Sequence, residues 1–229
     1  MTSSGEENVP SAMDALKHAR IAGVKPKDAA SLILIDRSGK RPHALMGRRG
    51  SAHVFMPDVY VFPGGRRDAR DFALPFAADL DPQVTEKLLV GGPARIGPSR
   101  ARALALTALR ELKEETGLAP GDGGADLSRL RYVARAITPP GNVRRFDTRF
   151  FLAFLDETGF DVNHLSDSNE LQDLRWLDIG ELSGLKLPAI TKTVLEDVRG
   201  LMDADPSLPF GSPVNFYLMR RGQFVRSRL

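Results

Sequence analysis

Apolar and polar positions along the chain predict strands in its first quarter. Positions 30–35 form an apolar run, and a polar turn separates them from the apolar positions 44–46. This pattern is typical of two strands joined as a hairpin. A third short strand is expected at 59–65, where the segment VYVFPGG ends in a double glycine.

The clearest helix is predicted at 99–117. Its apolar side chains recur at helical spacing and share one face of the helix: Ala105, Ala108, Leu109 and Leu112. Ser99 is the expected N-cap, because a serine side chain accepts a hydrogen bond from the first free backbone N–H groups. Gly117 stands where a left-handed C-cap belongs.

The remaining pattern completes a mixed α/β chain. Further helices are expected at 12–23, at 81–91 (capped by Asp81 and stopped by Gly91) and at 189–205. Further strands are expected at 130–138, 148–156 and 174–179, and the tail 206–229 reads as extended and irregular. Trp176 is expected in the core. Hairpin-like connections favour a mixed sheet flanked by helices over a doubly wound parallel sheet.

Composition narrows the class of protein. A chain of 229 residues with 42% hydrophobic and 27% charged residues can bury a core, and we expect one domain over 13–229 after a disordered 1–12. Its apolar runs are too short to span a bilayer and no apolar signal core is visible, so a cytoplasmic location is expected. The absence of cysteine excludes disulfides and thiolate metal sites.

The charge pattern favours a small phosphorylated partner. The net charge is only +3, and 29 acidic residues dilute any long-range field, which argues against nucleic acid as the main partner. Arginines occur in pairs, and a guanidinium binds two phosphate oxygens at once. These pairs are Arg48-Arg49, Arg66-Arg67, Arg144-Arg145 and Arg220-Arg221.

The end of the 99–117 helix concentrates acidic side chains in the segment RELKEETGL, residues 110–118. Glu111 and Glu115 are four positions apart and share a face, with Glu114 at its edge. Such crowding is unfavourable at a helix C-terminus, so the three carboxylates are either a solvated face or the ligands of a cation. Oxygen ligands suit Mg²⁺ or Mn²⁺.

This segment resembles the second half of the Nudix box, whose pattern is G-x5-E-x7-R-E-U-x-E-E-x-G-U with U aliphatic. Every specified position of that half is filled here, by Arg110, Glu111, Leu112, Glu114, Glu115, Gly117 and Leu118. The FPGG sequence that ends the third strand is also similar to the family, and it makes Gly65 the opening glycine of the box. The chain is thus identified by resemblance as a Nudix hydrolase.

The first half of the box departs from the pattern. From Gly65 to Arg110 there are 45 positions where the pattern has 14. The residue eight positions before Arg110, where the first glutamate of the box belongs, is Arg102. That glutamate commonly supports the box arginine in the family. In this chain the support of Arg110 is expected from Glu86, Asp79 or Asp81 in the insertion, or from no acidic residue at all.

The long insertion, placed at 66–100, resembles one branch of the family. This branch has an interrupted box and includes the peroxisomal coenzyme A diphosphatases and many bacterial relatives. The resemblance covers roughly 29–181. It implies a Nudix-like α/β/α sandwich with a mixed sheet, a C-terminal helix and an extended tail. A homodimer is an expectation drawn from the family alone.

The resemblance implies a metal-dependent diphosphatase. The expected substrate is a nucleoside diphosphate linked to a moiety X, with coenzyme A or its acyl esters first, then ADP-ribose or dinucleotides. The implied metal ligands are Glu111, Glu115, Glu114 and the backbone near Gly65, with Mg²⁺ or Mn²⁺ bound, and Arg110 braces the loop. The alternative is a Nudix-fold sensor that binds such a ligand without cutting it.

The resemblance leaves other roles open. Expected contacts to phosphate or nucleoside come from Arg48, Arg49, Arg66, Arg145 and Phe146, of which Phe146 either stacks on a base or belongs to the core. The general base is either a box glutamate, Glu114, or an acid on a later loop. Of the later acids Glu157, Asp167 and Glu170, Glu170 is the best placed in the sequence.

Overall fold

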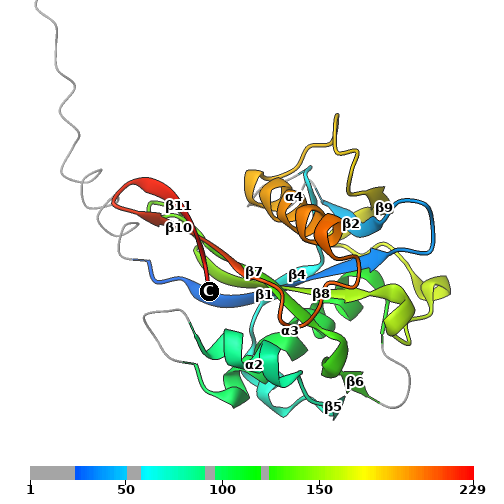
Figure 1. Ribbon diagram of the computed structural model, residues 1–229, viewed down its shortest axis with the longest axis horizontal. Coiled ribbons are helices and arrows are strands. Elements are labelled where there is room, and N and C mark those ends of the chain that lie inside the picture. The colour runs from blue at the N-terminus through cyan, green and yellow to red at the C-terminus, as the bar shows by residue number, and fades with distance from the viewer. Residues whose placement is uncertain (1–23, 51–57, 91–95, 120–123) are drawn as a thin grey trace, which may run out of the picture.

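A mixed β-sheet runs through the centre of the structure (Figure 1). The computed structural model describes residues 24–50, 58–90, 96–119 and 124–229, so the disorder expected at 1–12 and the helix expected at 12–23 lie outside the described residues. Within them the sheet has the order β11-β10-β7-β8-β1-β2-β3, with β4 paired to β1 and β9 paired to β2. The strands are β1 (Lys27–Asp36), β2 (His43–Arg49), β3 (Tyr60–Val61), β4 (Gly64–Arg66), β7 (Arg131–Ile137), β8 (Phe146–Phe154), β9 (Leu171–Asp178), β10 (Asn215–Arg220) and β11 (Gln223–Arg228).

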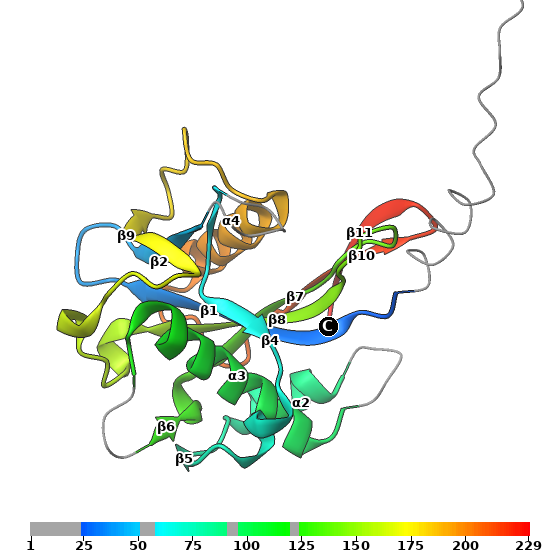
Figure 2. The ribbon, with the colours of Figure 1, turned by 180° about the vertical axis from the view of Figure 1, so that it is seen from behind.

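Helices cover both faces of this sheet, as expected for an α/β/α arrangement. Helices α2 (Pro82–Leu89) and α3 (Pro98–Thr116) lie on one face, and α4 (Ala189–Ala204) lies on the other (Figures 1 and 2). Two apolar cores result. One contains Leu104 and Leu112 of α3, and the other contains Val194 and Leu195 of α4. None of the helices in the described ranges has the length and hydropathy that a membrane crossing requires.

The ends of the helices agree with the sequence in part. Gly117 adopts a left-handed conformation with φ of 77° and its N–H bonds to the Lys113 carbonyl, which confirms the expected C-cap of α3. Asp81 caps α2 through the backbone N–H of Gln83, as expected. The expected N-cap at Ser99 is wrong: α3 begins at Pro98 after Gly97, because proline favours the first helical position. The expected stop at Gly91 lies outside the described residues.

The tail is more regular than the sequence indicates. Its expected irregular conformation is wrong over 215–228, where β10 pairs in parallel with β7 and antiparallel with β11. Arg221 and Gly222 both have positive φ, of 51° and 77°. Two such residues form the turn that joins twisted antiparallel strands, so the end of the chain adds a hairpin to the sheet.

The insertion between the double glycine and α3 is packed onto the sheet. After β4 come a short 3₁₀ helix (Ala69–Ala73), β5 (Phe76–Ala78) paired in parallel with β6 (Ala125–Asp126), and then α2. Arg67 and Arg100, from the two ends of this segment, both bond the buried carboxylate of Asp28 at the start of β1. The insertion therefore begins and ends at one ion cluster on the sheet.

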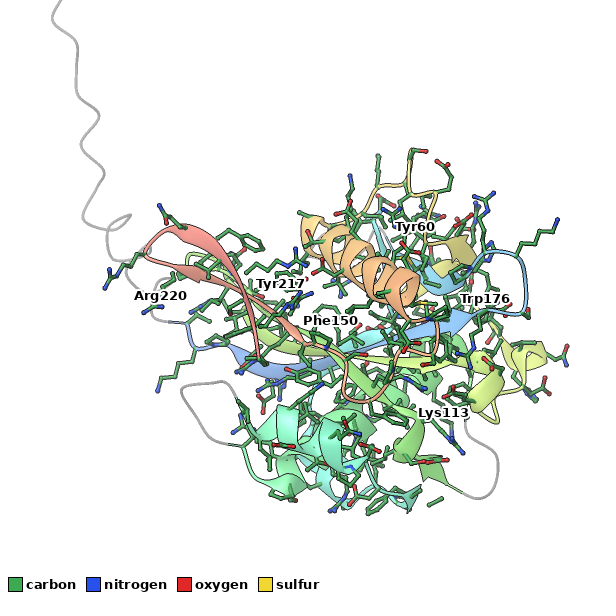
Figure 3. All side chains as sticks on the ribbon, in the orientation of Figure 1. Tyr60, Lys113, Phe150, Trp176, Tyr217 and Arg220 are labelled. Carbon is green, nitrogen blue, oxygen red and sulfur yellow. The ribbon has the colours of Figure 1, made fainter. Side chains whose placement is uncertain are left out.

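Trp176 is partly buried against the core cluster that contains α3, in agreement with its expected place. Its position near β9 can be followed in Figure 3.

Candidate functional site

The double glycine forms strand β4, which lies between β1 and helix α3. Gly64 and Gly65 pair with Ser31 and Ala30 of β1, and the Ser31 hydroxyl donates to the Pro63 carbonyl at 2.8 Å. A Cβ atom on Gly64 would lie 2.6 Å from the Ala30 carbonyl oxygen. A Cβ on Gly65 would lie 2.4 Å from the carboxyl group of Glu111. Both glycines are therefore required by close approach.

Helix α3 brings two of its carboxylates to these glycines. The Gly64 N–H donates to Oε2 of Glu115 at 2.8 Å, and the Glu111 carboxylate lies against Gly65. Glu115 is only 5% exposed, and the Glu111 side chain is 13% exposed. The four-residue spacing that put these two residues on one face in the sequence is thus realised at β4.

Burial and like charge make ionisation of both carboxylates unfavourable. Burial raises the pKa of Glu115 to about 8, the Gly64 N–H opposes this shift, and the charges of Glu111 and Glu170 add to it. The pKa of Glu111 is also raised, mainly by burial, although the neighbouring Arg110 guanidinium lowers it in part. Two buried carboxylates with so few cationic partners are a site that a cation would stabilise.

Arg110 joins this part of α3 to the segment that follows β4. Its Nε donates to Oδ1 of Asp71 at 2.7 Å, its Nη1 to Glu111 at 2.8 Å, and its Nη2 to the Arg66 carbonyl at 3.2 Å. Asp71 is fully buried and also accepts from the Thr107 hydroxyl and the Asp68 N–H, each at 2.8 Å. Burial alone would raise the pKa of Asp71, but these donors outweigh it and lower the pKa.

Asp71 is the residue that the sequence analysis missed. The candidates Glu86, Asp79 and Asp81 do not contact Arg110: Asp79 pairs with Arg102 at 2.5 Å, and Asp81 caps α2. Asp71 stands six positions after Gly65, which is the G-x5-E spacing of the box with aspartate in place of glutamate. The interruption therefore lies after Asp71. Counting forward from the glycine, rather than back from Arg110, would have found it.

Glu114 shares Nη1 of Arg110 with Glu111 and lies at the exposed edge of the helix face. Its side chain is 47% exposed and pairs with Arg70 at 3.0 Å and with Arg110 at 2.8 Å. Across the described residues, no group of three or more acidic, histidine or cysteine side chains is arranged to hold a metal ion. The expected role of Glu114 as a third metal ligand stays a prediction, and in this structure its carboxylate pairs with two arginines.

Glu170 adds a third negative charge to the Glu111–Glu115 pair. It precedes β9, its side chain is exposed, and its charge raises the pKa of both glutamates. No hydrogen bond or ion pair to its carboxylate occurs within the described part of the chain. Glu157 instead pairs with Arg131 and Arg37, and Asp167 accepts the backbone N–H groups of Asp173 and Leu174. Of the three later acids, Glu170 is the one whose charge raises the pKa of both glutamates.

A cavity of about 240 Å³ adjoins the double glycine. Gly64, Gly65, Arg49, Arg66 and Phe146 all line it, whereas the box glutamates do not. Arg49 also lies close enough to Glu115 for its charge to lower that pKa. The sequence thus brings three of the five expected substrate contacts to one cavity, which we call the β4 cavity.

The other two expected substrate contacts lie elsewhere. Arg48 pairs with Asp58 at 3.1 Å and does not line the β4 cavity. Arg145 donates to the backbone carbonyls of Thr138 and Val24, at 3.0 and 2.7 Å. Its guanidinium therefore fixes the β7–β8 loop.

The donor set at β4 fits a hard divalent cation. Glu111 and Glu115 supply carboxylate oxygens, and both lie against the backbone of the β4 glycines. Magnesium sites commonly use only one or two carboxylates and leave the other positions to water and substrate phosphates. Two convergent carboxylates are therefore sufficient as the protein's share of such a site.

Comparisons with known proteins found similarity to one family. A model of the NUDIX domain matches residues 100–198, which include most of α3. A solved Nudix hydrolase from Alicyclobacillus acidocaldarius is 26% identical, with a TM-score of 0.55, over 76% of this chain and 91% of that one. No match was found to any curated protein.

Two further solved structures are similar at lower identity. A C. elegans Ap4A hydrolase in a binary complex is 14% identical, with a TM-score of 0.47, over 78% of this chain and 98% of that one. The NUDIX domain of Shewanella oneidensis NrtR, in complex with ADP ribose, is 14% identical, with a TM-score of 0.47. The similarity covers 83% of this chain and 98% of that one.

The domain match, the mixed sheet between two helical layers and the carboxylates at β4 all point to one class of protein, the Nudix hydrolases. The NUDIX domain match over 100–198 and the similar solved Nudix hydrolase support an enzyme of that class. Nudix hydrolases generally use divalent metal ions and act on small nucleotide-diphosphate substrates.

Proposed function

We propose that the protein hydrolyses the diphosphate bond of a nucleoside diphosphate linked to a moiety X, with Mg²⁺ or Mn²⁺ bound at β4. The observation that carries this proposal is the placement of Glu111 and Glu115 against the backbone of Gly64 and Gly65. Glu111, Glu115 and the Gly65 backbone would hold the cation. When bound, it supplies charge neutralisation to the diphosphate and acidifies the attacking water.

The chain's own residues have distinct roles in this proposal. Arg49 and Arg66 line the β4 cavity and would contact phosphate oxygens through their planar guanidinium groups. Phe146 lines the same cavity and offers a ring for a nucleobase. Arg110 and Asp71 hold β4 against α3, so they position the two carboxylates.

Glu170 is our choice for the general base, with Glu114 as the alternative from the sequence. A base must be free to accept a proton near the reacting atoms. The charge of the Glu170 carboxylate raises the pKa of Glu111 and Glu115, and this carboxylate has no bonded partner among the described residues. Glu114 is bonded to two arginines, which favours a role in holding Arg110.

A substrate panel tests the reaction. We expect that incubation with Mg²⁺ and coenzyme A, its acyl esters, ADP-ribose or a diadenosine polyphosphate releases a mononucleotide from at least one of them. Chromatography of the products measures this release. If none is turned over while one of these ligands raises the melting temperature, the protein is a sensor and the hydrolase proposal fails.

The Glu115→Gln variant tests the site. We expect turnover to fall by at least about 10²-fold, because the change removes a charge needed at the reacting diphosphate. The metal-free melting temperature should stay the same or rise, since a buried carboxylate is removed while the Gly64 N–H keeps an oxygen acceptor. Glu196→Gln, on the exposed face of α4, is the matched control. Near-normal turnover in Glu115→Gln would remove the metal assignment.

A further inference from the structure

A second, larger cavity continues from the β4 cavity. It has a volume of about 540 Å³ and lies between the β7–β8 loop, the start of α4 and the β10–β11 hairpin. The two cavities share five lining residues: Thr138, Thr148, Phe150, Pro188 and Ile190. We call the larger one the hairpin groove. In Figure 3, Phe150 and Tyr217 lie on the side of the sheet that faces α4.

The hairpin groove is apolar. Its walls carry Ile137, Phe150, Ile190, Leu218, Met219 and Phe224, and none of the described residues that line it is charged. Phe224 is 60% exposed and stacks on the buried Tyr217, with ring centroids 6.0 Å apart and an interplanar angle of 13°. A large exposed aromatic ring on a concave apolar surface is a feature of ligand and partner sites.

The polar groups of the groove are largely used inside the protein. The Thr193 hydroxyl donates to the Ala189 carbonyl at 3.0 Å, and the Asn142 amide donates to the Pro139 carbonyl at 3.1 Å. The Thr138 hydroxyl accepts the Phe146 N–H at 3.1 Å. A sugar or phosphate placed here would lose its hydrogen bonds to water and find few new partners. An apolar group has no such hydrogen bonds to lose.

The two cavities thus differ in chemistry along one continuous path. The β4 cavity has two arginines and adjoins the carboxylate pair, whereas the described walls of the hairpin groove are mainly apolar and its polar groups are largely bonded within the protein. We propose that the hairpin groove binds the X moiety of the substrate and selects an apolar X, an alkyl or acyl chain, over a sugar or a second nucleoside. This proposal rests on the proposed function for the position of the diphosphate.

A homologous series of substrates tests this selection. The probes are adenosine diphosphates esterified on the terminal phosphate with ethyl, butyl, hexyl or octyl alcohol. Their polar control is an oligo(ethylene glycol) ester of the same length as octyl. We expect kcat/KM to rise roughly fourfold for each added methylene, which is the usual gain from burying such a group. The glycol ester should behave like the ethyl ester.

Binding is measured separately from cleavage. Analogues with a methylene bridge between the two phosphorus atoms are not hydrolysed, and calorimetry gives their dissociation constants. We expect these constants to fall with chain length by the same factor for each methylene. If binding tightens but no ester is cleaved, the groove proposal stands and the hydrolase proposal fails. If neither kcat/KM nor the dissociation constant depends on chain length, the groove proposal is overturned.

The Phe224→Asp variant places a charge in the groove on an exposed strand. We expect the octyl-to-ethyl ratio of kcat/KM to fall to near one in this variant. Val162→Asp, an exposed apolar position in another segment, is the control and should keep the wild-type ratio. An unchanged ratio in Phe224→Asp would contradict the proposal. A dimer that Phe224→Asp dissociates, with no chain-length effect in the wild type, would assign the groove to a second copy.

Discussion

Arg110 shows how single side chains hold the site together. Its guanidinium bonds Asp71 from the segment after β4, Glu111 and Glu114 from its own helix, and the carbonyl of Arg66. Burial by itself lowers the pKa of Arg110, but the Asp71 hydrogen bond and the Glu111 charge raise it above its usual value. Arg110 is therefore charged throughout the physiological range and fixes β4 against α3.

The Asp71→Asn change should both destabilise the protein and impair turnover. It leaves the charge of Arg110 without its buried partner, and breaking such a pair costs about 3–5 kcal/mol of unfolding free energy. Because the pKa of Asp71 is lowered on folding, its contribution is present above about pH 4 and is lost as pH falls through the folded-state value. Urea unfolding at pH 7 and at pH 3 measures the difference.

Asp79→Asn is the matched control. Asp79 also pairs with an arginine, Arg102, but its side chain is 48% exposed. An exposed pair contributes about 0–1 kcal/mol, so this variant should unfold nearly as the wild type does. Equal losses in the two variants would contradict the special role assigned to Asp71.

The two glycines of β4 should respond differently to alanine. In Gly65→Ala the new methyl meets the flexible end of Glu111, which can swing away. We therefore expect a folded protein with little activity. In Gly64→Ala the methyl meets the Ala30 carbonyl and the Ser31 Cα atom, which are backbone, so β4 must shift. Thermal unfolding together with turnover measures both, and normal activity in Gly65→Ala would contradict the close approach to Glu111.

For single residues, the sequence predicted where the side chains lie along the chain better than it predicted which side chains they pair with. The four-residue spacing placed Glu111 and Glu115 together, and the double glycine before them placed Gly65 correctly. Glu114 has the same charge and shares Arg110 with Glu111, yet its side chain is 47% exposed and also pairs with Arg70. Arg70 comes from a segment whose fold the sequence does not reveal, so this outcome was not predictable.

Among the elements, the C-terminal hairpin is joined to helix α4 through one carboxylate. Asp197 of α4 accepts the Asn215 amide at 2.8 Å, and it also accepts the Tyr217 hydroxyl and the Arg226 guanidinium. These donors come from both strands of the hairpin. One helical carboxylate thus joins α4 to β10 and β11, and it does so beside the hairpin groove.

The Asp197→Ala change should loosen the hairpin. Three donors lose their acceptor, one of them on the buried Tyr217, so we expect a loss of about 1–3 kcal/mol in stability. Relative to the wild type, the variant should show faster hydrogen exchange at the amides of β10 and β11, whereas exchange at the amides of β1 and β8 should change less. Asp203→Ala, at the exposed end of α4, is the control. Unchanged exchange at β10 in the Asp197 variant would show that strand pairing alone holds the hairpin.

Helices and strands were predicted correctly where the sequence has a clear apolar periodicity or a clear helix-capping residue. Helices α3 and α4 and the strands β1, β2, β7 and β8 follow from apolar periodicity. The hairpin was missed because its exposed strand β11 has no alternating pattern and its turn is Arg221-Gly222, where asparagine or aspartate is usual before glycine. Its stability comes from β7 and Asp197, which are distant in sequence.

In the whole molecule, the site forms at strand β4, which is reached by helix α3 from one face of the sheet and by the start of helix α4 from the other. Helix α3 contributes the carboxylates on one face of the sheet, and the segment at the start of α4 contributes Pro188 and Ile190 to the β4 cavity from the other. The Asp28 cluster fastens the insertion beside this strand: the pKa of Asp28 would rise with burial, but Arg100, Arg149 and Arg67 lower it. Folding of both layers is therefore needed before the site exists.

Divalent cations should therefore stabilise the folded protein as a whole. Cation binding at Glu111 and Glu115 occurs only in the folded state and relieves the repulsion between two buried carboxylates. At about 100 times the dissociation constant, such binding adds about 2.7 kcal/mol, which for a chain of this length raises the melting temperature by roughly 5–10 °C. Calorimetry with MgCl₂ or MnCl₂ measures the shift, and KCl at equal ionic strength is the control. The Glu111→Gln/Glu115→Gln double variant should melt higher than the wild type without metal and show no shift with it. An equal shift in both proteins would place the cation elsewhere, because only the α3 carboxylates bring this pair of charges to β4.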